Sequence, residues 1–386
     1  MRVFELHYRG EKENTGFAKQ YHPMHVMGGI GQVWGSVRDP LPAARPAKML
    51  NEIGPGESHY NRYDSLIADT GKQWLKNRAS ILDDKPWVLY LSFVAPHFPL
   101  VVPKQYYDLY PLEGLPDRKF DPEAGYQRHP WLQRQDDFSQ IDRHLSPLQR
   151  RMAVAAYFGL CTYVDALIGE VVDTLDHLGL GDNTRIVYSS DHGDNVGARG
   201  MWGKSNLYQE SAGVPLILSG PDVPEGDVCE TPVSLLDTYQ TVLQAVGLKS
   251  TDEEGTLSGR SWFETAGAGY DPDRIVFSEY HAAQSPTGAF MIRRGDFKLN
   301  YYVDYDPEFF DLKKDPEETQ NVADDPIYEA HVREYMAALR GICDPEATDR
   351  CAKDDQNELI ERFGGREAAL SMGTPGATPV AGQEQK

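Results

Sequence analysis

An acidic residue and an imidazole stand side by side where an apolar run ends. The sequence SDHGD occupies 190–194 and follows the apolar residues 186–188, so Asp191 and His192 come at the end of an expected strand. In open α/β sheets, ligands bind beyond the carboxyl ends of the strands. Lys204 follows about one loop later. A carboxylate, an imidazole and an ammonium group can together hold a divalent metal and an oxyanion, so this segment is a candidate site.

Each candidate residue also fits an ordinary structural role when it is taken alone. A histidine in an Asp-His-Gly triplet often caps or packs, and a single lysine such as Lys204 is usually a solvated surface charge. His97 stands between two prolines, where a packing role in a rigid loop and a role in a site are equally open. Arg199 and Glu210 are expected to be structural or surface ion-pair residues.

The composition limits the classes of partner. With 386 residues, of which 40% are hydrophobic, the chain can bury one large domain and a smaller one. The 38 basic and 59 acidic residues give a net charge of −21, which argues against nucleic acid and anionic membranes as partners. A site for an anion must therefore create its own local positive field.

The cysteines and the apolar segments limit the compartment. The four cysteines lack C-x-x-C spacing, so neither a zinc site nor a dense disulfide framework is expected, and a reduced, cytoplasmic protein is favoured. The first residues contain no long apolar stretch, and we expect no apolar span of about 20 residues anywhere, which is typical of a soluble protein.

The first half of the chain predicts a strand, a long helix and a second strand. Residues 1–80 are expected to be irregular, and the apolar run 87–94 predicts a buried strand that stops at the prolines of 95–99. The polar segment 115–145 predicts a surface excursion. A helix capped by Ser146 and a strand at 185–190 complete a strand–helix–strand order, which predicts a right-handed crossover in a parallel sheet.

The sequence pattern changes in the second half of the chain. A strand is expected at 214–218, and the sequence SLLD at 234–237 resembles a capping box that opens a helix ending near Gly247. A helical tail is expected from 327 to about 363, followed by an extended arm. Short alternating runs separated by turn residues predict an antiparallel sheet at 274–281, 288–293, 296–302 and 306–311.

Taken together, these motifs resemble the sulfatases of the alkaline phosphatase superfamily. The motifs are APHFP at 95–99, SDHGD at 190–194, GKSNLYQES at 203–211, VPLI at 214–217 and FFDLKKDPEET at 309–319. A histidine rather than an asparagine after Asp191, and the Gly-Ala-Thr-Pro tail, place the chain nearest the choline-sulfatase and phosphonate monoester hydrolase branch.

The resemblance implies an α/β fold. A mostly parallel sheet between helices is expected, truncated at the N-terminus, with a small C-terminal antiparallel sheet subdomain. The expected divisions are a partial catalytic domain at 1–248, the antiparallel sheet at 249–326, and a C-terminal helix with an extended arm at 327–386.

The resemblance also implies a role for each candidate residue. Asp191 and His192 match metal ligands, and Lys204 matches the lysine that binds the sulfate or phosphonate oxygens. His97 matches the histidine beside the ester oxygen of the leaving group, and His7 matches a histidine near the nucleophile. The implied cofactor is one divalent metal ion, calcium in first place with manganese or magnesium as alternatives, held weakly in this chain.

The chain departs from the family pattern in its nucleophile. Sulfatases use a Cys or Ser in a C/S-x-P-x-R motif, which is converted to formylglycine, and no such motif occurs in this sequence. Cys161 lies inside a predicted helix and cannot substitute. The early Asp pair is also missing, and Phe4 and Glu5 replace the glycine and lysine of a Gly-Lys-x-His element. Replacing that cation by an anion reverses an interaction worth roughly a few kcal/mol.

These departures carry an expectation about stability. We expect the chain to begin inside the family's catalytic domain, without the first strand of the sheet. Exposed strand edges and apolar surface would then make the isolated chain less stable than its relatives.

Three functions follow as hypotheses. The first is a sulfuric ester hydrolase, impaired or inactive as this chain. The second is a catalytically dead protein that binds an anion or a partner. The third is a phosphonate or phosphate ester hydrolase of the same superfamily. In each enzyme hypothesis the substrate is a small anionic ester, without nucleic acid or membrane, and we expect a homo-oligomer formed through the C-terminal arm.

Overall fold

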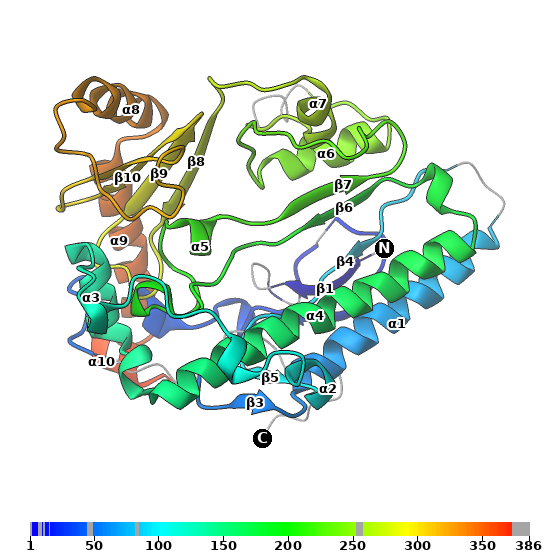
Figure 1. The fold of residues 1–386 in the computed structure, drawn as a ribbon, viewed down its shortest axis with the longest axis horizontal. Helices are drawn as coiled ribbons and strands as arrows, with labels where there is room; N and C mark the ends of the chain where they lie inside the picture. Colours follow the sequence, from blue (N-terminus) through cyan, green and yellow to red (C-terminus); the bar gives the residue numbers. More distant parts are fainter. Residues whose placement is uncertain are drawn as a thin grey trace.

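Two long helices run side by side and carry the first half of the fold (Figure 1). They are α1 (His59–Ala79) and α4 (Pro147–His177) in a computed structural model. The structure describes residues 2–6, 10, 12–14, 16–44, 49–81, 85–251 and 258–372. The helix expected at Ser146 is confirmed as α4. Its first turn is a capping box, in which the Ser146 hydroxyl accepts from Gln149 N at 3.2 Å and the Gln149 amide accepts from Ser146 N at 2.9 Å.

Helix α1 shows that the expectation of an irregular segment over 1–80 was wrong. Ser58 and Asn61 form a second capping box at its start. Its buried apolar stripe is narrow, with Tyr63, Ile67 and Leu75 at helical spacing among polar residues. A stripe this thin gives a weak periodic signal, and the helix is stabilised by packing on α4.

The strands of the first half form small sheets. One has the order β2-β1-β4, with both strand pairs parallel, and β3 pairs in parallel with β5. Strands β6 and β7 pair antiparallel along their whole length. The bounds are β1 (Arg2–Leu6), β2 (Gln20–His25), β3 (Ile53–Pro55), β4 (Tyr90–Leu91), β5 (Leu100–Val102), β6 (Ile186–Ser189) and β7 (Leu216–Ser219).

The expected parallel crossover from the 87–94 strand to the 185–190 strand is not seen among these residues. Strand β4 covers only Tyr90–Leu91, and beyond it the backbone N–H groups of Val94 and Ala95 donate to the Asp64 carboxylate, at 2.7 and 2.9 Å. Strand β6 pairs with β7, not with β4. Apolar side chains on these strands are exposed, including Val187 and Ile217. The expected lower stability stays a prediction.

The C-terminal sheet is confirmed. Four strands in the order β11-β10-β9-β8 are antiparallel throughout. Phe290, Ile292 and Leu299 pack from this sheet against Leu339 of helix α8 (Glu329–Ile342). The bounds are β8 (Ile275–Tyr280), β9 (Ala289–Arg294), β10 (Phe297–Tyr302) and β11 (Glu308–Asp311).

The helical tail is also confirmed, as α8 (Glu329–Ile342), α9 (Pro345–Arg362) and α10 (Arg366–Ser371). The extended arm from 373 onward lies outside the described residues. The helix expected after 234 is α6 (Asp237–Ala245), and the Asp237 carboxylate accepts from Ser234 N at 2.9 Å. The remaining α-helices are α2 (Lys104–Tyr107), α3 (Pro130–Ser139), α5 (Gln209–Ala212) and α7 (Trp262–Gly267).

Short 3-10 turns connect these elements. They are η1 (Met27–Gly29), η2 (Val33–Ser36), η3 (Leu112–Gly114), η4 (Pro122–Ala124), η5 (Asp142–His144), η6 (Gly181–Asn183) and η7 (Ala198–Gly200).

The segment 115–145 is not the surface excursion that its polar composition predicted. It contains α3, whose Trp131, Leu132 and Phe138 are buried. The Trp131 ring stacks on Tyr302 of the C-terminal sheet at 5.0 Å, and its indole N–H donates to Thr287 O at 3.2 Å. Burial here depends on a partner about half the chain away, which local composition does not reveal.

Helix α4 is long and apolar enough to cross a membrane by length and composition, contrary to the expectation that no such span occurs. Its Ala153, Ala156 and Leu160 are buried in a core cluster with Leu100 and Val102 of β5. We therefore interpret α4 as a core helix.

A buried ion pair joins the C-terminal sheet to the loop that follows Lys204. Lys298, which is 1% exposed, donates to the Glu318 carboxylate and to Leu207 O at 2.5 Å. The second Glu318 oxygen accepts from Gln209 N at 2.7 Å. The backbone from 207 to 209 is therefore held by side chains from distant segments.

A second buried pair confirms the structural role expected for Arg199 and Glu210, which lie 2.7 Å apart. The Arg199 guanidinium is fully buried and lies over the Tyr208 ring at 4.0 Å. Arg199 therefore stabilises the packing beside the candidate site and has the structural role that the sequence predicted.

Removing one partner of the Lys298–Glu318 pair should be costly. We expect Glu318→Ala to lower the free energy of unfolding by about 3–5 kcal/mol, because it leaves a buried ammonium without its counter-charge. The neighbouring Glu317 is half-exposed in its pair with Lys119, so Glu317→Ala should cost less than about 1 kcal/mol. Urea unfolding of both variants makes the comparison, and equal losses would contradict the buried position of Glu318.

Burial raises the pKa of the Cys161 thiol to about 11, so the thiol stays protonated and unreactive near neutral pH. Cys229 and Cys351 are exposed. We expect iodoacetamide to label Cys229 and Cys351 in the folded protein, and Cys161 only after denaturation. Peptide mass spectrometry gives the order of labelling, and rapid labelling of native Cys161 would contradict the packing of α4.

Candidate functional site

The loop after β6 places Asp191 and His192 together. His192 Nε2 lies 2.6 Å from Lys204 Nζ, and His192 Nδ1 lies 2.8 Å from Gly193 O. An ammonium group only donates hydrogen bonds, so Nε2 must accept, and Nδ1 carries the proton and donates to Gly193 O. In this arrangement the acceptor nitrogen of His192 faces the lysine.

Asp191 lies at the outer rim of the same loop. Its Oδ2 is 3.5 Å from His192 Nε2, and its Oδ1 accepts from the backbone N–H of His192 at 3.0 Å. The Asp191 side chain is 83% exposed, against 27% for His192. The carboxylate is therefore accessible, while the imidazole is largely covered.

His97 lies next to His192, although it comes from a distant loop. Its ring centroid lies 6.1 Å from that of His192, and its Nδ1 is 2.8 Å from Phe98 O, which can only accept. The loop of His97 is anchored by the buried Asp64 carboxylate of α1, through the bonds to Val94 N and Ala95 N. Helix α1, which the sequence did not predict, thus helps to place a candidate residue.

The residue before Lys204 is held by the segment that follows His192. Gly203 N donates to Asp194 Oδ1 at 3.0 Å, and Gly203 O accepts from Asn195 N at 2.8 Å and from the Asn195 amide at 2.6 Å. Burial raises the pKa of Asp194, against the two backbone N–H groups that bind its charged form and the nearby Lys204. These bonds tie the two ends of the candidate site together.

The structure thus brings together Asp191, His192, Lys204 and His97, while His7 lies outside the described residues. The roles that the resemblance implies for them stay predictions. Sequence reasoning missed Asp64 and Asp194 as supporting residues. Asp194 stood in the same motif and could have been noticed, whereas Asp64 carries no local signal.

A complete metal site does not form from these donors. Within the described ranges, no group of three or more His, Cys, Asp or Glu side chains is arranged to hold a metal ion. Asp191 and His192 offer two donors, and His192 Nε2 is engaged by Lys204. Calcium takes six to eight oxygen ligands, so the described donor set does not fit the expected metal.

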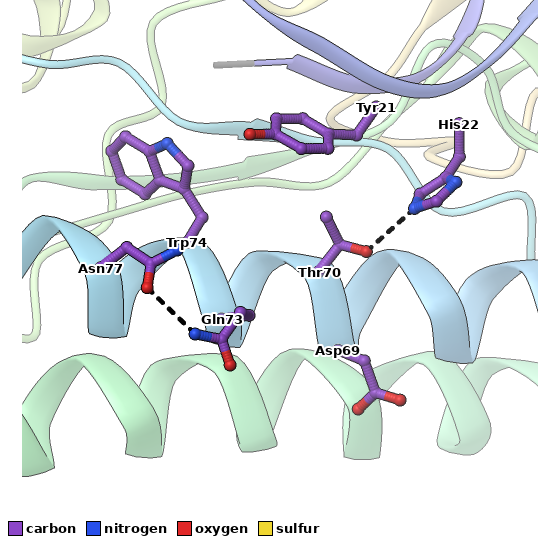
Figure 2. A pocket seen from close by; sticks show the side chains of 7 residues that line it. All are labelled: Tyr21, His22, Asp69, Thr70, Gln73, Trp74 and Asn77. Atoms are coloured by element: carbon purple, nitrogen blue, oxygen red, sulfur yellow. Dashed lines mark hydrogen bonds between the residues drawn. The ribbon is translucent and has the colours of Figure 1, made fainter.

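A separate cavity of about 470 Å³ lies between β2 and α1. Figure 2 shows its lining side chains, in which Gln73 and Asn77 bond to each other at 3.0 Å and His22 bonds to Thr70 at 3.2 Å. None of the candidate residues lines it. We therefore place the candidate site at the His97–His192–Lys204 cluster and not at this cavity.

Family models match most of the chain. The sulfatase model matches residues 11–248, and the model of the N-sulphoglucosamine sulphohydrolase C-terminal region matches residues 197–342. The two matches together include all the candidate residues except His7.

Individual relatives agree with these models. The choline-sulfatase of Rhizobium meliloti is 32% identical over 309 residues, which are 76% of this chain and 58% of the relative. The multifunctional alkaline phosphatase superfamily protein PehA of Trinickia caryophylli is 30% identical over 301 residues, which are 70% of this chain and 57% of the relative. The chain thus spans less than two thirds of the length of these relatives.

A solved structure shows the same fold. The phosphonate monoester hydrolase SpPMH from Silicibacter pomeroyi superposes with a TM-score of 0.62 at 28% identity, over 78% of this chain and 64% of that one. The expected α/β fold with a small C-terminal antiparallel sheet is confirmed. The chain belongs to the sulfatase family of the alkaline phosphatase superfamily, in the branch that holds choline-sulfatase and phosphonate monoester hydrolase relatives.

Proposed function

We propose that this chain provides the anion-binding and leaving-group part of a sulfuric ester hydrolase site. The observation that carries the proposal is a cluster of one ammonium and two imidazoles in a chain with a net charge of −21, with Lys204 and His192 beyond the end of β6 and His97 in the loop before β5. Lys204 would hold the sulfate oxygens, with His192 fixing the position of its ammonium. The choline-sulfatase relative supports sulfate esters as the substrate class.

His97 would handle the departing oxygen. Hydrolysis of a sulfate ester breaks the bond between sulfur and the alcohol oxygen, and that oxygen must gain a proton as it leaves. Protonated His97 could donate it from Nε2, because Nδ1 is directed to Phe98 O. The imidazole would then need a proton from solvent before the next turnover.

The proposal includes impaired turnover by this chain. The C/S-x-P-x-R motif that supplies the nucleophile of sulfatases is not found in the 386 residues. Sulfatase family members generally bind a divalent metal, and calcium, with manganese or magnesium as alternatives, stays a proposal for this chain. No step of the proposed function passes through a metal, because the described residues supply two donors for one.

A second candidate is phosphonate monoester hydrolysis. It is favoured by the structural likeness to SpPMH, and it would use the same residues, with Lys204 on the phosphonate oxygens. A third candidate, binding of an anion without turnover, is favoured by the missing nucleophile motif.

A cytoplasmic location and a homo-oligomer formed through the residues from 364 onward are further proposals. Light scattering after deletion of those residues tests the oligomer.

Sulfate binding tests the role of Lys204. We expect Lys204→Ala to raise the Kd for sulfate about tenfold or more, because a charge-assisted hydrogen bond is lost. Calorimetric titration at constant ionic strength measures the change. Lys313→Ala is the matched control, since it removes the same charge from a side chain that is 77% exposed and pairs with Asp296. Equal Kd values for the wild type and Lys204→Ala would contradict the proposal.

Turnover tests the proposed impairment and compares the first candidate with the second. We expect saturable binding of para-nitrophenyl sulfate with turnover far below the roughly 10 per second of a typical enzyme. Release of nitrophenol from this ester and from a para-nitrophenyl phosphonate monoester is compared at equal concentration. Turnover at an ordinary enzymatic rate would refute the proposed impairment. A phosphonate monoester turned over faster than the sulfate ester would favour the second candidate.

A further inference from the structure

The residue after Lys204 is held by two elements from elsewhere in the chain. The Ser205 carbonyl accepts from the Gln135 amide of α3 at 2.6 Å, and the Ser205 hydroxyl lies 2.9 Å from the Tyr280 hydroxyl of β8. In Figure 1, α5, which directly follows this loop, lies beside the antiparallel sheet. The loop of Lys204 is thus attached to the C-terminal sheet as well as to the segment after His192.

The direction of the Ser205–Tyr280 bond follows from the number of protons. The Tyr280 phenol has one proton and lies 2.8 Å from Ala283 O, which can only accept. Tyr280 therefore donates to Ala283, and the Ser205 hydroxyl donates to the Tyr280 oxygen. Both hydroxyl groups are satisfied only in this arrangement, so the orientation of Ser205 is well defined.

The backbone of Ser205 needs such support. Its φ of 86° lies in the left-handed region, which is unfavourable for a residue with a Cβ and persists where surrounding contacts hold it. The contacts that do so at Ser205 come from Gln135 and Tyr280. Because Ser205 directly follows Lys204, holding its backbone also fixes the chain on the C-terminal side of the lysine.

We propose that Tyr280 is a positioning residue for Lys204. Through the Ser205 hydroxyl it holds the ammonium beside His192, where the sulfate oxygens would bind, without touching the anion itself. This inference rests on the proposed function, and it adds the C-terminal sheet to the determinants of anion affinity. Gln135 has a similar position, but its side chain is fully buried, so its replacement would also disturb the core.

Sulfate affinity in a double-mutant cycle tests the proposal. We expect Tyr280→Phe and Ser205→Ala each to raise the Kd for inorganic sulfate about three- to tenfold, because each removes the bond between Ser205 and Tyr280. Because both remove the same bond, their combination should weaken binding no more than either alone. In the Lys204→Ala background, Tyr280→Phe should have no further effect, since its influence passes through the lysine.

A control variant separates positioning from general stability. The Tyr335 hydroxyl also donates to a backbone carbonyl, that of Arg294, at 2.5 Å, but on the α8 side of the sheet. Tyr335→Phe should therefore leave the Kd for sulfate unchanged, with thermal unfolding recorded for each variant.

Each outcome decides one question. If Lys204→Ala binds sulfate as well as the wild type, the proposed function fails. If Lys204→Ala weakens binding and Tyr280→Phe does not, the positioning role fails and the function stands. Equal effects of Tyr280→Phe with and without Lys204 would also overturn the positioning role, because they would show a general structural effect.

Discussion

The buried pair of Lys298 and Glu318 is the constraint on which the arrangement around the candidate site depends. Taking two charges out of water is expensive, so the pair persists only with further hydrogen bonds. Here those bonds go to Leu207 O and Gln209 N, which are the backbone of the loop beyond Lys204. The buried charges need the hydrogen bonds of this loop, and the loop is held by the two charged side chains. Burying the charges and placing the loop therefore depend on each other.

Buried carboxylates also accept backbone hydrogen bonds around the candidate site. Asp64 uses both carboxylate oxygens on the backbone before His97, and Asp194 uses one oxygen on two backbone N–H groups that flank the turn to Lys204. Irregular loops cannot satisfy their N–H groups with neighbouring strands, so side chains supply the missing acceptors. The precision of the site comes from these acceptors rather than from regular secondary structure.

Local signals explain which elements could be predicted from the sequence. The capping box at Ser146 and the alternating strands of the C-terminal sheet are each defined by a short segment of sequence, and the structure confirms both. Helices α1 and α3 were missed because many of their buried residues are polar and their partners lie far away in the chain. The expected strand at 87–94 is reduced to Tyr90–Leu91, and the N–H of its last expected residue, Val94, donates to a side chain of α1, which no strand periodicity shows.

The candidate site divides in the same way. Asp191, His192 and Lys204 lie within fifteen positions of one another and could be found as a motif. The residues that support them are remote in the sequence, because Gln135 is 70 positions and Tyr280 is 75 positions away from Ser205. Only the folded chain shows that these remote residues meet at Ser205.

The contact between His192 and Lys204 has a consequence for the position of the lysine. His192 Nε2 has one lone pair, and that lone pair faces the Lys204 ammonium at 2.6 Å. A metal ion bound at Nε2 would take the same lone pair and displace the ammonium. The present position of Lys204 and a metal ion on this nitrogen are therefore mutually exclusive.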